Sequence, residues 1–173
     1  MDRNNLVLIG FMGTGKSTIG MRLAEKLNWT FKDTDLEIER AEGYTVQELF
    51  SARGEPTFRE MESAILKQIL SEKRQVVATG GGCVLAEGNR VSMQESGFVV
   101  SLGASVETIV SRVEGVNNRP LLAGDIREKV TELIQRRMGV YGFAHYHVDT
   151  DGREPEEIAD LIIREFHKEP DFT

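Results

Sequence analysis

A glycine-rich octapeptide near the start of the chain, GFMGTGKS at residues 10–17, leaves few folds open to this sequence. It fits the pattern G-x-x-x-x-G-K-[ST] and lies between a short apolar run and a segment with helical spacing. The glycines let backbone N–H groups point at phosphate oxygens, and the following helix adds the positive end of its dipole. Lys16 can reach the β- and γ-phosphates of a nucleotide, and the Ser17 hydroxyl can bind Mg²⁺. We therefore predict a nucleotide-binding loop with contacts from Gly13, Thr14, Gly15, Lys16, Ser17 and Thr18.

Short apolar runs alternate with amphipathic segments along the whole chain. The runs predict strands at Leu6–Ile9, Trp29–Phe31, Val76–Ala78, Phe98–Leu102 and His147–Asp149. The intervening segments predict helices through Ile19–Leu27, Leu36–Glu42, Val46–Arg53, Phe58–Ile69, Val106–Val113 and Asp125–Arg137, and one after Pro155. Apolar strands that do not alternate are typical of parallel sheets with helices on both faces. We expect one α/β domain over residues 1–173, a three-layer α/β/α sandwich around five parallel strands, with a loop or flap at 114–124.

The acidic composition limits what the chain can bind. It has 21 Lys and Arg against 28 Asp and Glu, a formal charge of −7. A net acidic surface argues against general binding of nucleic acid or of anionic membranes, so an anionic ligand needs a few locally placed basic groups. The single cysteine, Cys83, excludes an intrachain disulfide, and we expect it to be unreactive. Because no apolar run is long enough to cross a bilayer, we expect a cytoplasmic protein.

Two carboxylates, Asp33 and Asp35, follow the second expected strand. Ligands of parallel α/β folds bind at the carboxyl edge of the sheet, so Asp33 can hold Mg²⁺ and Asp35 can face the hydroxyl group of an acceptor. The alternative for Asp35 is structural, as the N-cap of a helix that begins at Leu36.

Three consecutive glycines, Gly80, Gly81 and Gly82, follow the third expected strand. Glycine runs cost chain entropy, which favours the interpretation that another group approaches this backbone closely. A flexible turn between a strand and a helix is the alternative interpretation.

The arginines outside the octapeptide are weak signals one by one. Arg59 and Glu62, three residues apart at a helix start, can form a solvated surface pair that contributes little. Arg119 lies in the flap, where an arginine is usually solvated. Arg136 and Arg137 end a helix, where the dipole favours cations.

Together these motifs resemble the shikimate kinase family over nearly the whole chain. The resemblance is carried by GFMGTGKS at 10–17, DTD at 33–35, FREME at 58–62, TGGG at 79–82, NRPLLAG at 118–124 and the R-x-x-x-Y of Arg137 and Tyr141. It implies a P-loop NTPase fold of the nucleoside-monophosphate kinase group and a monomer. It also implies transfer of the ATP γ-phosphoryl group to the 3-hydroxyl of shikimate, with Mg²⁺, in aromatic amino acid biosynthesis.

On the nucleotide side, the resemblance implies roles for several basic residues. Lys16 would contact the phosphates, and Arg119 would close with the flap, a lid at about 114–124, onto the transferred phosphoryl group. Asp33 would lie near Mg²⁺ with Ser17. Arg112 and Arg153 would flank the adenine end of ATP.

On the acceptor side, the resemblance implies that helices at about 35–70 bind shikimate. Asp35 would contact its hydroxyls as the candidate base, and Arg59 and Arg137 would bind its carboxylate. Gly80, Gly81 and Gly82 would offer backbone contacts, and Glu62 would orient Arg59.

The sequence departs from the family pattern at one place. Gly139 stands where the family motif R-x-P-x-Y has proline, and the stretch that follows, YGFAHYHVDT, is about one residue short. This leaves Arg136 open as an alternative to Arg137 for the carboxylate.

Three other classes of function remain open on sequence alone. A gluconate kinase or a nucleoside-monophosphate kinase would share the fold, but FRxxE with three glycines suits a small acid better than a nucleotide. A GTPase-type switch would carry the guanine signature N-K-x-D, which does not occur in the chain. An inactive nucleotide-binding module is disfavoured because Lys16, Asp35, Arg59 and Arg119 are all present.

Overall fold

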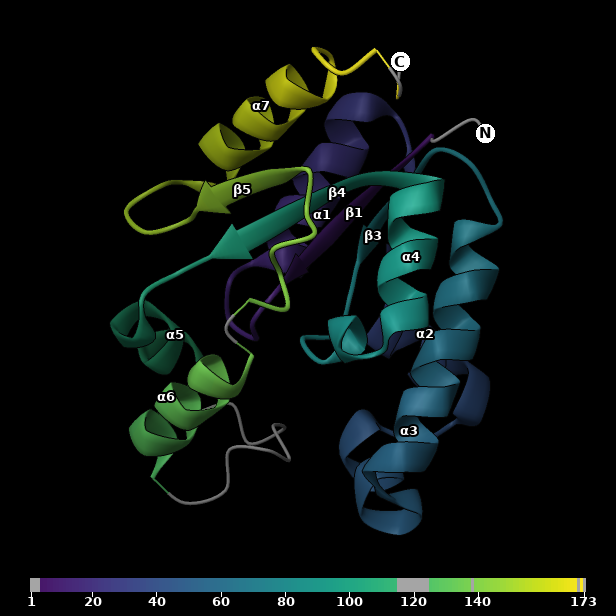
Figure 1. The fold of residues 1–173 in the computed structure, drawn as a ribbon, viewed down its shortest axis with the longest axis vertical. Helices are drawn as coiled ribbons and strands as arrows, with labels where there is room; N and C mark the ends of the chain where they lie inside the picture. Colours follow the sequence, from purple (N-terminus) through teal and green to yellow (C-terminus); the bar gives the residue numbers. More distant parts are fainter. Residues whose placement is uncertain (1–3, 115–124, 138, 171, 173) are drawn as a thin grey trace.

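A five-stranded parallel sheet forms the centre of the molecule (Figure 1). The computed structural model describes residues 4–114, 125–137, 139–170 and 172. The sheet has the strand order β2-β3-β1-β4-β5, with bounds β1 (Asn5–Gly10), β2 (Thr30–Asp33), β3 (Gln75–Ala78), β4 (Gly97–Gly103) and β5 (Tyr146–Asp149). Every neighbouring pair is parallel. The predicted α/β class and its five parallel strands are confirmed.

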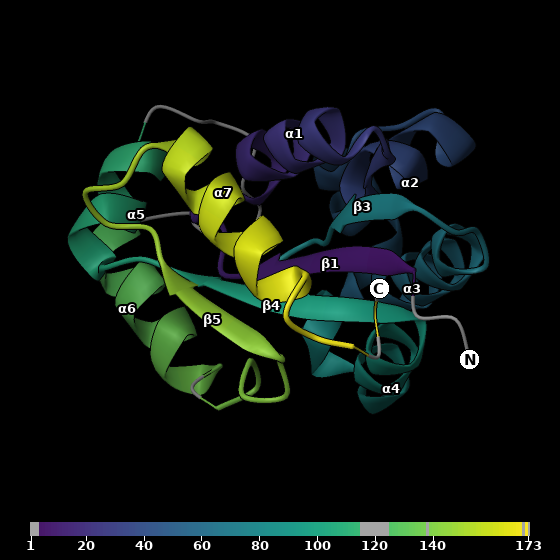
Figure 2. The ribbon, with the colours of Figure 1, turned by 90° about the horizontal axis from the view of Figure 1, so that it is seen from above.

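Helices cover both faces of the sheet (Figure 2). Their bounds are α1 (Lys16–Leu27), α2 (Thr34–Glu42), α3 (Val46–Leu70), α4 (Glu87–Ser96), α5 (Val106–Val113), α6 (Ile126–Arg136) and α7 (Pro155–Phe166). In the fully buried strand β1, Leu6 and Leu8 pack in the cluster that includes α1 and α7. Val7 and Ile9 point the other way, into the cluster that includes α3 and α4. Alternate side chains of one apolar strand therefore fill two separate cores, as a three-layer sandwich requires.

Two elements differ from the prediction. The two helices expected on either side of Pro56 run together as α3, broken only at Gly54, whose φ of +80° and ψ of 164° are not helical. The helix α4, and the short 3₁₀ turn Cys83–Leu85 before it, were not predicted. Only Asn89 and Met93 of α4 are buried, so its sequence carries little of the apolar periodicity that reveals a helix.

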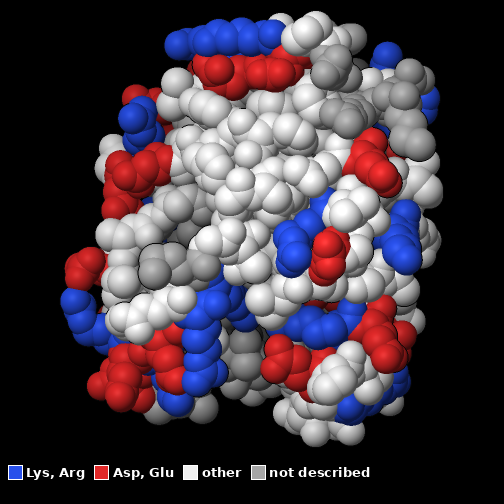
Figure 3. Space-filling view, viewed as in Figure 1, with Lys and Arg blue, Asp and Glu red and all other residues white. Residues whose placement is uncertain are grey.

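Three further findings concern the surface, the helices and the predicted lid. Figure 3 shows charged side chains of both signs around one face of the molecule, with neither sign in one continuous patch. Among the described residues, no helix has the length and the apolar character that a membrane crossing needs. The predicted lid at 114–124 lies, apart from Glu114 at the end of α5, outside the described residues.

Helix α1 offers a matched pair of positions for testing the core. Leu23 is fully buried and Met21 is 53% exposed on the same helix. Leu23→Ala should lower the free energy of unfolding by about 2–5 kcal/mol because it leaves a cavity, and Met21→Ala should cost less than about 1 kcal/mol. Urea denaturation measures both. Equal losses for the two variants would contradict the packing described for α1.

Candidate active site

A cavity of about 580 Å³ opens at the carboxyl ends of β1, β2 and β3. The octapeptide follows β1, the two aspartates end β2 and start α2, and the three glycines follow β3. The predicted site residues that line the cavity are Gly13, Gly15, Lys16, Ser17, Thr18, Asp33, Asp35, Arg59, Gly80, Gly81, Gly82, Arg112 and Arg137. Three segments far apart in the sequence thus meet at one edge of the sheet because their strands are parallel neighbours.

The octapeptide at residues 10–17, here called the phosphate loop, is stabilised by hydrogen bonds from its own side chains. Gly13 and Gly15 have φ angles of +77° and +91°, which favour glycine. The Lys16 ammonium donates hydrogen bonds to the carbonyl oxygens of Gly10 (2.9 Å) and Phe11 (2.8 Å). The buried Thr14 hydroxyl donates to the Phe11 carbonyl at 2.7 Å, and Thr14 does not line the cavity. Thr14 therefore stabilises the loop through its side chain instead of facing the cavity as the other predicted contacts do.

Ser17 and Asp33 bring two oxygen donors together at the cavity. The Ser17 hydroxyl donates to Asp33 Oδ2 at 2.6 Å. Asp33 Oδ1 accepts from the backbone N–H groups of Asp35 (3.0 Å) and Leu36 (3.4 Å). The N-cap of α2 is thus Asp33, and the alternative in which Asp35 caps this helix is wrong. A hydroxyl and a carboxylate are hard oxygen ligands of the kind that Mg²⁺ uses beside phosphate, so the two residues fit such an ion.

Thr34 anchors the three glycines, Gly80, Gly81 and Gly82, here called the glycine loop. Sequence reasoning missed this role. It is fully buried between the two aspartates, and its hydroxyl accepts the backbone N–H of Gly80 at 2.9 Å. Its position inside the DTD motif was the signal available, because a small hydroxyl there can turn inward while the aspartates flank it.

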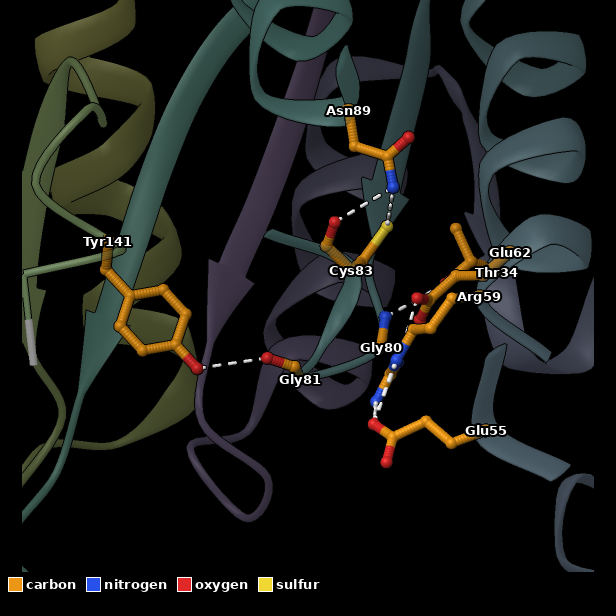
Figure 4. A network of polar contacts seen from close by, with 9 residues as sticks. All are labelled: Thr34, Glu55, Arg59, Glu62, Gly80, Gly81, Cys83, Asn89 and Tyr141. Carbon is orange, nitrogen blue, oxygen red and sulfur yellow. Dashed lines mark hydrogen bonds and ion pairs between the residues drawn. The ribbon is translucent and has the colours of Figure 1, made fainter. Parts of the chain in front are cut away.

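Arg59 is fixed on both sides by carboxylates (Figure 4). Its guanidinium lies 2.8 Å from Glu62 and 3.1 Å from Glu55. The Glu62 side chain is only 1% exposed, so the expectation of a solvated surface pair is wrong. The guanidinium also lies 5.6 Å and 5.5 Å from the ring centres of Phe50 and Phe58, which line the cavity. These neighbours hold Arg59 in one orientation.

The three glycines leave room for the charged side chains around them. A Cβ on Gly80 would lie 2.6 Å from Glu62 Oε1 and 2.8 Å from Asp35 Oδ1. A Cβ on Gly82 would overlap the Arg59 guanidinium. The glycine run is therefore a close approach of backbone to functional side chains, and more than a flexible turn.

Arg137, and not Arg136, points into the cavity. Arg137 is 5% exposed and lies 5.6 Å from the Phe11 ring centre. Its Nη1 atom is buried without a hydrogen-bond partner. Arg136 has a side chain that is 68% exposed and pairs with Glu132. A buried, unpaired guanidinium N–H is costly unless a ligand accepts from it.

Of the three arginines predicted to contact the nucleotide, only Arg112 is found at the cavity among the described residues. Arg112 lines the cavity and donates to the Gly13 carbonyl at 2.9 Å. Arg153 is exposed and does not line the cavity. Arg119 lies outside the described residues.

The charges around Glu62 change its titration. Burial, as the largest cause, raises the pKa of Glu62 from 4.5 to about 7. The Asp35 carboxylate raises it further, and Arg59 and Arg137 oppose the shift. Burial also raises the pKa of the Cys83 thiol well above its usual value, which fits the expected lack of reactivity.

The amino-acid sequence is similar to those of known shikimate kinases. A family model described as "Shikimate kinase" matches residues 12–167. The shikimate kinase of Thermodesulfovibrio yellowstonii is 44% identical over 165 residues, which are 95% of this chain and 95% of that protein. That of Geobacter sulfurreducens is 42% identical over 162 residues, 93% of this chain and 90% of that protein.

Solved structures extend the comparison to the fold. "Shikimate kinase from Acinetobacter baumannii in complex with shikimate" superposes with a TM-score of 0.92 at 36% identity, covering 95% of this chain and 93% of that one. A gluconokinase from Sinorhizobium meliloti superposes with a TM-score of 0.57 at 18% identity, covering 92% and 89%, which shows a shared fold alone. The family model matches most of the chain, and the chain therefore belongs to the shikimate kinase family.

Proposed function

We propose that this chain is a shikimate kinase, which transfers the γ-phosphoryl group of ATP to the 3-hydroxyl of shikimate and releases ADP. The observation that carries the proposal is the pair of arginines, Arg59 and Arg137, beside the glycine loop in the same cavity as the phosphate loop. Arginine binds carboxylates through two parallel N–H donors, and Arg137 Nη1 is buried without a partner. An acceptor with one carboxylate and several hydroxyls suits these groups.

Phosphoryl transfer depends on alignment and charge neutralisation more than on covalent chemistry. Lys16 leaves the loop carbonyls to contact the β- and γ-phosphates. Asp35, at the start of α2, accepts the proton of the 3-hydroxyl as the oxygen of that hydroxyl attacks the γ-phosphorus of ATP and ADP leaves. Arg119 closes over the transferred group with the lid and excludes water, which would otherwise compete as acceptor.

The Mg²⁺ requirement is part of the proposal. Ser17 and Asp33 would hold the ion, and when bound it would neutralise the β- and γ-phosphate oxygens. Within the described ranges no group of three or more His, Cys, Asp or Glu side chains is placed to bind a metal. An ion held by two protein oxygens and by nucleotide phosphates fits that finding.

We also propose that the enzyme acts as a monomer. The phosphate loop, Arg59 and Arg137 line one cavity within one chain, so a single copy can supply both the nucleotide contacts and the acceptor contacts.

The acceptor is tested directly by coupled ADP release. With ATP and Mg²⁺, shikimate should stimulate ADP release, and gluconate and nucleoside monophosphates should not. Lys16→Ala serves as the control for release that depends on the phosphate loop. Absence of stimulation by shikimate would refute the proposed function.

Arg59→Ala separates acceptor binding from nucleotide binding. Loss of a charge-assisted contact to the shikimate carboxylate should raise the KM for shikimate about ten- to a hundredfold, and the KM for ATP should stay within about twofold. Arg53→Ala is the control, because Arg53 lies on the same helix and pairs with Glu42 away from the cavity. An equal rise in the KM values for shikimate and for ATP would mean general damage to the site.

The raised pKa of Glu62 predicts a pH-dependent stability. Between pH 4.5 and about 7, Glu62 stays protonated in the folded protein and ionises in the unfolded one. The folded state then binds more protons, so stability falls as pH rises through this window, by about 3 kcal/mol in total, and levels off above it. In the Glu62→Gln variant this side chain cannot ionise, so the fall in stability between pH 4.5 and about 7 that comes from Glu62 should be absent. Urea denaturation from pH 4.5 to 8 measures the difference, and parallel curves for the two proteins would contradict it.

A further inference from the structure

The segment between α6 and β5 is the one place where the sequence departs from the family motif, and it folds as a run of tight turns. Gly139 has a φ of +90°, which glycine adopts without strain. Backbone N–H groups of Val140, Gly142 and Ala144 donate to the carbonyls three residues earlier, at 3.1–3.2 Å. These turns place Tyr141 against the core cluster beneath α3 and α4.

From this position the Tyr141 hydroxyl reaches the glycine loop. It donates to the Gly81 carbonyl at 3.0 Å, across 60 residues of sequence. Figure 4 shows that Tyr141 approaches the loop from one side, while Thr34 and Arg59 lie on the other. Because Thr34 accepts from the Gly80 N–H, the loop is tied on both sides by side chains.

The tie at Gly81 lies next to Arg137. A Cβ on Gly81 would be 3.4 Å from Arg137 Nη1 and 3.3 Å from the Met12 backbone nitrogen, so the guanidinium rests against this glycine. Tyr141 and Arg137, four residues apart, thus converge on one backbone unit. Displacement of Gly81 would open space beside the buried guanidinium and let it change orientation.

We propose that Tyr141 is a positioning residue for the acceptor site, whose hydroxyl fixes Gly81 and thereby the orientation of Arg137. This inference rests on the proposed function, in which Arg137 binds the acceptor carboxylate. Burial raises the pKa of the Tyr141 phenol. The charge of Arg137, a side-chain hydrogen bond with Arg137 and the charge of Arg59 oppose this rise, and the hydroxyl stays protonated and remains a donor.

Tyr141→Phe tests the role, because it keeps the ring in the core and removes only the hydroxyl. The KM for shikimate should rise about three- to tenfold, with the KM for ATP within twofold and the thermal midpoint nearly unchanged. Tyr146→Phe, at the start of β5, is the matched control and should change neither KM. An unchanged KM for shikimate in Tyr141→Phe would overturn the inference, as would an equal rise in both KM values.

A double-mutant cycle tests whether the effect passes through Arg137. In an Arg137→Lys background, which lacks the guanidinium fork, Tyr141→Phe should raise the KM for shikimate less than twofold. The methyl ester of shikimate, which has no carboxylate charge, should likewise respond little to Tyr141→Phe. If Tyr141→Phe raised the KM for shikimate by the same factor with and without Arg137→Lys, Tyr141 would not act through Arg137, and the inference would be overturned. If the wild-type protein phosphorylates shikimate, the proposed function stands, and these variants then test the role of Tyr141 alone. If the wild-type protein does not phosphorylate shikimate, both the proposed function and the role of Tyr141 are refuted.

Discussion

The whole site depends on backbone that carries no side chains. At Gly80 and Gly82 the volume of a β-carbon is already taken by oxygens of Glu62 and Asp35 and by the Arg59 guanidinium. Any larger residue would push apart groups whose charges balance one another in a buried place, where an unpaired charge is costly. Thr34 and Tyr141 then hold this bare backbone from two sides. The Arg59 guanidinium occupies its place because Gly82 has no side chain there.

The sequence predicts the fold and most of the cavity for identifiable reasons. Strands β1 and β4 contain the apolar runs Leu6–Ile9 and Phe98–Val100, which do not alternate with polar residues and therefore indicate parallel pairing without knowledge of the partner. The phosphate loop, the aspartates and the glycines each follow a strand, and the carboxyl ends of parallel strands share one edge. Proximity of these motifs therefore follows from local patterns alone.

The remaining features depend on tertiary contacts that no local pattern encodes. The spacing of Arg59 and Glu62 indicates that they can pair, but only the packing of α3 on the sheet buries Glu62. Arg136 and Arg137 are adjacent, so the choice between them depends on the rotation of α6 at its last turn. Helix α4 escaped prediction because it buries an asparagine and a methionine where a regular apolar stripe is expected.

The Lys16 ammonium has a consequence for which anions the loop retains. It is already solvated by two carbonyl oxygens of its own loop, at 2.8 and 2.9 Å. A ligand therefore exchanges one set of contacts for another, and a small anion that engages only this ammonium gains little from the exchange. A polyphosphate that also uses the loop N–H groups gains more than it displaces. The loop therefore favours ligands that engage its backbone N–H groups together with Lys16 over anions that contact the ammonium alone.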